Sequence, residues 1–172
     1  GVVSAACLAR DGHQVVGVDP NSIKTGLVNE GKTPIIETGL DALISDSVAA
    51  GRLAAGDDVS AAVLSSSLFL ICVGTPGHGN GSLDLSYVRR VCEQIGAALK
   101  ETDEYKVVVV RSTMLPGSMA SVVIPALEGA SRRLVIQEPQ EGDVMARITY
   151  LTERLDRLTP YLSDELVTRI AD

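Results

Sequence analysis

The chain has 172 residues, of which 45% are hydrophobic and 22% charged, and its net charge is −7 at pH 7. This composition is ordinary for a globular protein, and the length suits one domain with an appendage. The acidic balance argues against a nucleic-acid-binding protein, which needs a clustered basic face, and no apolar run approaches the ~20 residues of a membrane helix.

Three cysteines, Cys7, Cys72 and Cys92, stand in apolar contexts without CxxC or Cys/His spacing. This spacing predicts neither a disulfide framework nor a metal site. We therefore expect reduced thiols and a cytoplasmic protein.

The first 19 residues predict half of a nucleotide-binding unit. Residues 1–13 are typical of a small-residue helix ending at a glycine, and residues 14–19 of a strand closed by Asp19. In a dinucleotide-binding βαβ unit, an acid about 20 residues past the glycine fingerprint takes the ribose hydroxyls. Gly1 fits the last glycine of that fingerprint. We therefore expect a fragment whose sheet lacks its first strand.

The rest of the chain up to residue 130 alternates predicted helices with predicted strands. Helices are predicted over 22–29, 40–48, 60–67, 85–99 and 119–127, with Pro125 distorting the last, and buried strands over 68–73 and 106–113. This alternation predicts an α/β, Rossmann-like, doubly wound parallel sheet over residues 1–130.

Residues 131–172 differ in character. A further strand over 132–139 is possible, after which the apolar residues from Val144 to Leu158 recur at helical spacing until Thr159-Pro160 interrupts them. This pattern predicts a helical tail, to which we assign no chemistry.

The ends of the predicted strands open toward the cofactor crevice of such a sheet. Asp19 can accept hydrogen bonds from the adenosine ribose and repel a 2′-phosphate, favouring NAD over NADP, although it can also cap the next helix. Lys24 lies about one and a half turns further on, where it either reaches the adenosine or a phosphate, or is a solvated surface lysine.

The other two strand ends carry hydroxyl groups. Thr75 lies in Gly74-Thr75-Pro76 and Thr113 in Arg111-Ser112-Thr113, so that two threonines face one crevice; each can alternatively be a helix cap. Neither His13 nor His78 has a Ser, Cys or Asp placed to activate it. The residues therefore predict cofactor binding, with no catalytic histidine and no metal ligand.

Several strings resemble the UDP-glucose/GDP-mannose dehydrogenase family, the NAD-dependent nucleotide-sugar 6-dehydrogenases, over residues 1 to about 130. They are Gly17-Val18-Asp19 with Lys24, Gly31-Lys32-Thr33-Pro34-Ile35-Ile36-Glu37, Gly51-Arg52-Leu53, Ile71-Cys72-Val73-Gly74-Thr75-Pro76, Gly81-Ser82-Leu83-Asp84-Leu85 and Arg111-Ser112-Thr113-Met114-Leu115-Pro116-Gly117. The last string is more similar to the GDP-mannose branch. Thr38 and Ser118 depart from the family pattern, and so does the chain past Ser131.

The resemblance implies that Asp19, Lys24, Thr75 and Thr113 contact NAD. It also implies oxidation of a sugar C6 alcohol to a carboxylate through a cysteine thioester, in polysaccharide biosynthesis. The domains for catalysis and sugar binding have no counterpart here, so we expect a nucleotide sugar as partner only if they are supplied, and no catalytic residue in this chain. A homo-oligomer is one of the candidate partners. The alternatives are a fragment of a UDP-sugar dehydrogenase and a non-catalytic nucleotide-binding or interaction module.

Overall fold

The computed structural model describes residues 1–79 and 81–131, which belong to a compact unit spanning Gly1–Val135. Its elements, in chain order, are α1 (Val2–Arg10), β1 (Val15–Val18), α2 (Ser22–Asn29), α3 (Leu40–Ala49), β2 (Leu53–Gly56), α4 (Val59–Ser65), β3 (Leu68–Ile71), α5 (Ser86–Leu99), β4 (Val107–Val110), η1 (Met119–Val123) and α6 (Ile124–Ser131). The predicted tail, 131–172, lies outside the described residues except for Ser131, which ends α6.

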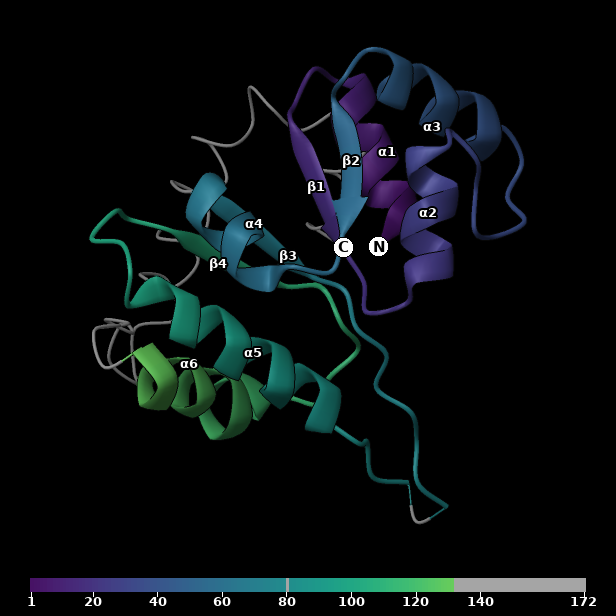
Figure 1. Ribbon diagram of the computed structural model, residues 1–172. Helices are drawn as coiled ribbons and strands as arrows, with labels where there is room; N and C mark the ends of the chain where they lie inside the picture. The colour runs from purple at the N-terminus through teal and green to yellow at the C-terminus, as the bar shows by residue number, and fades with distance from the viewer. Residues whose placement is uncertain (80, 132–172) are drawn as a thin grey trace, which may run out of the picture. The chain divides into compact units, whose positions relative to one another are not determined.

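Within residues 1–79 and 81–131, the four named strands pair in parallel and form two separate two-stranded sheets, β1 with β2 and β3 with β4 (Figure 1). Val15 pairs with Leu53 in the first sheet, and Leu68 with Val107 in the second. The doubly wound order is 3-2-1-4-5-6. If strand 1 is left out of this order, strands 3 and 2 form one pair and strands 4 and 5 form another. The first pair corresponds to β2 and β1, and the second to β3 and β4. The α/β class is as predicted.

Each sheet has its own cluster of buried apolar side chains. Ala6 and Ala9 of α1 pack with Ile44 of α3 and Leu53 of β2 in the first cluster. The second cluster contains residues of α4, β3, α5, η1 and α6: Val63, Ile71, Val88, Cys92, Ile95, Ala98, Leu99, Val123, Ala126 and Leu127. The predicted apolar stripe of residues 85–99 therefore forms the buried face of α5.

The strand β2 was not predicted from the sequence. Its residues, Leu53–Gly56, include no β-branched or aromatic side chain, so local propensity is weak. Pairing with β1 supplies the hydrogen bonds that propensity does not favour. The side-chain amide of Asn29 also pairs with the Ala55 backbone, donating to its carbonyl and accepting from its N–H at 2.8 Å each. The strand is thus specified by tertiary contacts.

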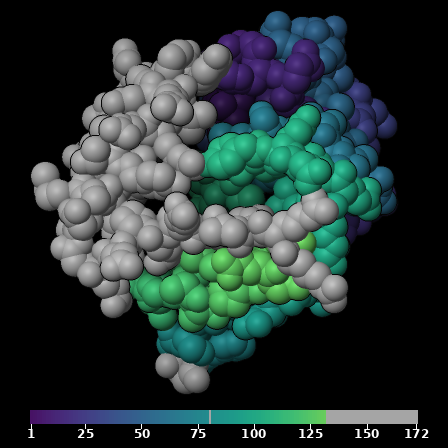
Figure 2. All heavy atoms as spheres, turned by 90° about the vertical axis from the view of Figure 1, so that its left-hand side faces the viewer, coloured from purple at the N-terminus to yellow at the C-terminus, as the bar shows by residue number. Residues whose placement is uncertain are grey.

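The predicted distortion at Pro125 is confirmed. The segment before it, Met119–Val123, is a π-helix, and the α-helix that follows runs to Ser131, beyond the predicted end at residue 127. Proline has no N–H to donate to the preceding turn, which explains the irregular start. Glu128 and Gly129 of α6 are exposed. The atoms of α6 are light green in Figure 2.

Candidate functional site

The first part of the site lies at the carboxyl end of β1. The Asp19 backbone N–H donates to the Gly56 carbonyl at 3.0 Å, which fixes Asp19 beside the end of β2. Its carboxylate accepts a hydrogen bond from the Asn21 backbone N–H at 2.9 Å through Oδ1, while Oδ2 lies 3.6 Å from the Lys24 Nζ. Both side chains are substantially exposed, at 41% for Asp19 and 53% for Lys24. The carboxylate therefore has lone pairs available to accept from a ligand hydroxyl.

Asn21, which was not among the predicted site residues, orients this pair. Its side-chain oxygen accepts from the backbone N–H groups of Ile23 and Lys24, which caps α2 at its amino end. Asn is among the preferred N-cap residues, so an Asn directly before a predicted helix was the available signal. The cap sets the direction of the first turn of α2 and hence the position of Lys24.

The second part of the site lies where the chain leaves β3 and β4. The Thr75 hydroxyl donates to the Thr113 backbone carbonyl at 2.7 Å, and the Ser112 hydroxyl donates to the Val73 carbonyl, also at 2.7 Å. These two bonds join the chain segments that follow β3 and β4, where the backbone pairing of the two strands has ended. Because the Thr75 proton is engaged, its oxygen can act only as an acceptor toward a ligand.

Arg111 connects the end of β4 to α1. Its guanidinium Nη1 donates to the hydroxyl of Ser4, which lies in the first turn of α1. No acidic side chain occupies that turn, and Gly1, at the N-cap, makes no side-chain cap bond. Helix amino ends favour anionic groups, and the positive charge of Arg111 reinforces this preference.

The four predicted cofactor residues are thus brought together as two pairs. Asp19 and Lys24 face each other after β1, and Thr75 binds Thr113 after β3 and β4. Of Thr113 it is the backbone carbonyl that takes part in this bond, whereas the sequence had suggested its hydroxyl.

The cysteines differ in environment. Cys92 is fully buried in α5, and burial, reinforced by the nearby Glu93 carboxylate, raises the pKa of its thiol to about 11. Cys72 was expected inside a buried strand, but it follows the last residue of β3 and is only half-buried. Cys7 is half-buried in α1. Among residues 1–79 and 81–131, no three His, Cys, Asp or Glu side chains gather as a metal site would require.

His78 belongs to the loop that precedes α5. The loop is closed by an antiparallel bridge between Gly77 and Leu83, and the His78 backbone N–H donates to the Ser82 carbonyl. Hydrogen bonds from the Ser86 side chain and backbone N–H hold the pKa of Asp84 below its ordinary value. Asp84 is therefore ionised, and its carboxylate is bonded to Ser86, the first residue of α5.

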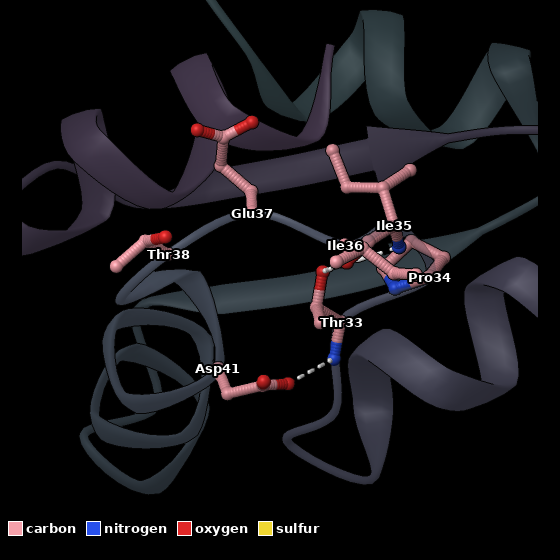
Figure 3. A pocket seen from close by; sticks show the side chains of 7 residues that line it. All are labelled: Thr33, Pro34, Ile35, Ile36, Glu37, Thr38 and Asp41. Carbon is pink, nitrogen blue, oxygen red and sulfur yellow. Dashed lines mark hydrogen bonds between the residues drawn. The ribbon is translucent and has the colours of Figure 1, made fainter.

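A surface hollow of about 350 Å³ is formed by the loop of residues 33–38 together with Asp41. Figure 3 shows the Asp41 carboxylate pointing at the Thr33 backbone N–H, which donates to it at 3.2 Å, while the Glu37 side chain extends away from both. None of the four predicted cofactor residues lines this hollow, so it is separate from the site described above.

Comparison with known proteins supports a cofactor-binding role. Residues 1–158 match the model of the UDP-glucose/GDP-mannose dehydrogenase family, NAD binding domain. A GDP-mannose 6-dehydrogenase of Pseudomonas aeruginosa is 50% identical over 131 residues, which are 76% of this chain and 30% of that protein. A UDP-glucose 6-dehydrogenase of Rhizobium meliloti is 39% identical over 143 residues, covering 81% and 32% of the respective chains.

Solved structures give the same result. A ternary complex of GDP-mannose dehydrogenase from Pseudomonas aeruginosa superposes with a TM-score of 0.76 at 50% identity, over 77% of this chain and 30% of that one. A UDP-glucose dehydrogenase from Pyrobaculum islandicum has a TM-score of 0.73 at 33% identity, over 76% and 30%. This chain spans about a third of the length of these relatives. No helix in the described part of the chain has both the length and the apolar character needed to cross a membrane.

Proposed function

The chain belongs to the UDP-glucose/GDP-mannose dehydrogenase family, and on that premise we propose that it forms the NAD-binding part of a nucleotide-sugar 6-dehydrogenase of the GDP-mannose type. The observation that carries the proposal is the position of Asp19. Its carboxylate follows β1, its side chain is 41% exposed, and its Oδ2 lies 3.6 Å from the Lys24 Nζ. Carboxylates at this position of a doubly wound sheet accept the ribose hydroxyls of NAD.

The residues at the strand ends fit this cofactor. Asp19 would hold the adenosine ribose, and its negative charge would repel the 2′-phosphate of NADP. Lys24, at 3.6 Å from Asp19, would add a cation near the ribose or a phosphate. The Thr75 oxygen, with its proton donated to Thr113, would accept a hydrogen bond from the dinucleotide. When bound, NAD supplies the hydride acceptor, and we assign no catalytic residue to this chain.

The choice of sugar rests on similarity. Identity is higher to the GDP-mannose enzyme, at 50%, than to the UDP-glucose enzyme of Rhizobium meliloti, at 39%. We therefore propose GDP-mannose as the substrate of the whole enzyme. We propose that this enzyme acts in the cytoplasm in polysaccharide biosynthesis, with a nucleotide sugar and further copies of the chain as partners.

An activated thiolate is needed for a thioester, and Cys92, fully buried with a raised pKa, does not supply one.

Calorimetric titration of the chain with NAD and with NADP tests the proposal. We expect saturable binding of NAD and weaker binding of NADP. GDP-mannose is then added to the NAD-loaded chain, and absorbance of NADH is followed; we expect no turnover. Absence of NAD binding would refute the cofactor role. Turnover that disappears when one cysteine is replaced would show that the chain itself is catalytic.

A further inference from the structure

The side-chain amide of Asn29, the last residue of α2, binds the outer edge of the first sheet (Figure 1). The Asp19 backbone N–H donates to the Gly56 carbonyl across the β1–β2 pair. Ala55, one residue earlier, therefore turns its N–H and C=O toward the opposite edge of β2. The Asn29 amide takes both groups, since it donates to the carbonyl and accepts from the N–H at 2.8 Å each. One side chain thus occupies the place of a neighbouring strand and ties the carboxyl end of α2 to β2.

The buried packing of α2 is concentrated at the same end of the helix. Val28, next to Asn29, is buried and belongs to the apolar cluster of the first sheet. In the amino half, Ile23 is 74% exposed, and Lys24 is exposed as well. The direction of α2 therefore depends on two attachments. One is the turn that follows β1 at the start of the helix, and the other is the Asn29 amide together with Val28 at its end.

Lys24 is carried by the exposed half of α2. Its Nζ lies 3.6 Å from the Asp19 Oδ2, and the two side chains are 53% and 41% exposed. Because an exposed ion pair contributes little, this contact alone does not fix the ammonium group. Lys24 precedes Asn29 in the helix, at a separation of about 7.5 Å along the axis. The place of the ammonium group therefore follows from the placement of the helix, and hence from its attachment at Asn29.

We propose that Asn29 is a positioning residue of the cofactor site: by tying the carboxyl end of α2 to β2, it holds Lys24 where its ammonium group meets the dinucleotide. This inference rests on the proposed NAD-binding function, in which Lys24 adds a cation near the ribose or a phosphate. Asn29 lies at the opposite end of the helix and acts only through Lys24. Without its amide, both Ala55 groups lose their partner, and α2 is attached at this end by the packing of Val28 alone.

Calorimetric titration of the full 172-residue chain with NAD tests this role through a double-mutant cycle of Asn29→Ala and Lys24→Met. Lys24→Met should weaken NAD binding by about two- to fivefold, the value of an exposed charge interaction. Asn29→Ala should weaken it by a similar or smaller factor. The doubly substituted chain should bind NAD no more weakly than Lys24→Met alone, because the group that Asn29 positions is already gone. Losses that multiply, or a single substitution without effect on NAD affinity, would overturn the proposal.

A second variant covers the case in which Asn29→Ala does not fold. Asn29→Asp keeps the size of the side chain and can still accept from the Ala55 N–H, but it cannot donate to the carbonyl. The same cycle with Lys24→Met then applies, with the same expected result.

The matched control for loss of stability is Lys106→Met. The Lys106 side chain is only 4% exposed, and its Nζ bonds the Glu104 carboxylate at 2.7 Å, so its loss should destabilise the fold. It precedes β4 and lies outside α2, so NAD affinity should be unchanged. A Lys106→Met chain that loses as much affinity as Asn29→Ala would overturn the positioning role, because destabilisation alone would then explain both. Failure of the unmodified chain to bind NAD would instead overturn the proposed function.

Discussion

The Thr75 hydroxyl donates a 2.7 Å hydrogen bond to the backbone carbonyl of Thr113, which joins the segments that follow β3 and β4. Ser112 forms a second such bond to the Val73 carbonyl. Each bond runs from a side chain of one segment to the backbone of the other, in opposite directions. Together they fix the segments that follow β3 and β4 against each other, beyond the backbone hydrogen bonds that pair the two strands.

Replacing Thr75 by Val should therefore weaken both the fold and cofactor binding. The substitution keeps the shape but removes the hydroxyl, and a neutral hydrogen bond contributes about 0.5–1.5 kcal/mol to the free energy of unfolding. NAD affinity should fall as well, because the acceptor oxygen is lost. Thr75→Ser retains the hydroxyl and is the matched control. Denaturant unfolding and calorimetric titration measure the two effects; a Val variant equal to the original chain in both would refute this role.

Replacing Asp19 by Ala should reduce NAD affinity and remove the discrimination against NADP. A hydrogen bond to a charged acceptor contributes about 1.5–3 kcal/mol, which is roughly ten- to a hundredfold in affinity. The Lys24 ion pair is exposed, so its loss should change stability little. Parallel titrations with NAD and NADP measure the result, with Asp46→Asn as control. Identical titration curves for the Ala variant and the original chain would contradict the assignment of Asp19 to the ribose.

The contact between α5 and α6 depends on a glycine. A Cβ added at Gly96 would lie 2.7 Å from the Ala130 Cβ and 2.8 Å from the Leu127 carbonyl oxygen. Gly96→Ala should therefore destabilise the protein by about 1–3 kcal/mol, the range for overpacking in a core. Gly129 of α6 has no such neighbour within 4 Å. Gly129→Ala should instead stabilise the helix by about 0.4–1 kcal/mol. Thermal unfolding of both variants tests this, and equal shifts of the same sign would rule out close packing at Gly96.

Much of the fold could be predicted from hydrophobic spacing. The periodic apolar pattern of α5 predicted its bounds to within one residue. The continuous apolar runs of β3 and β4 predicted both strands, but the observed strands are shorter than the predicted ranges 68–73 and 106–113. The strand β2 was missed because Leu53–Gly56 has little intrinsic strand propensity. Its conformation depends on β1 and on Asn29, which is 26 residues away from Ala55 in the chain. Such long-range contacts leave no local signal.

For the candidate site, too, some features could be predicted from the sequence and others could not. Asp19 and Thr75 could be proposed as site residues because each comes after a segment whose apolar residues predict a strand. Their place in the sequence therefore puts them near strand ends. The hydrogen bond from Thr75 to the Thr113 carbonyl could not be predicted, since it depends on how two chain segments separated by 38 residues leave neighbouring strands.

The burial of Cys92 should make the stability of the protein sensitive to alkaline pH. Burial raises the pKa of the Cys92 thiol from 9.0 to about 11 in the folded state. Between these values the thiol of the unfolded chain loses its proton while the folded one keeps it. The unfolded state then binds fewer protons, so the free energy of unfolding falls as pH rises from 9 to 11, by up to about 1.4 kcal/mol per pH unit for this one group. Below pH 9 this contribution is absent.

Chemical denaturation at a series of pH values measures this slope. The variant Cys92→Ala lacks the group, so its stability should fall less steeply above pH 9, whereas Cys7→Ala should keep the original slope because Cys92 remains. Alkylation gives a second readout: at pH 8 an added iodoacetamide should reach Cys92 only in denaturant, because the folded thiol is buried and protonated. Rapid modification of Cys92 in the folded chain, identified by peptide mapping, would contradict both its burial and the pH dependence derived from it.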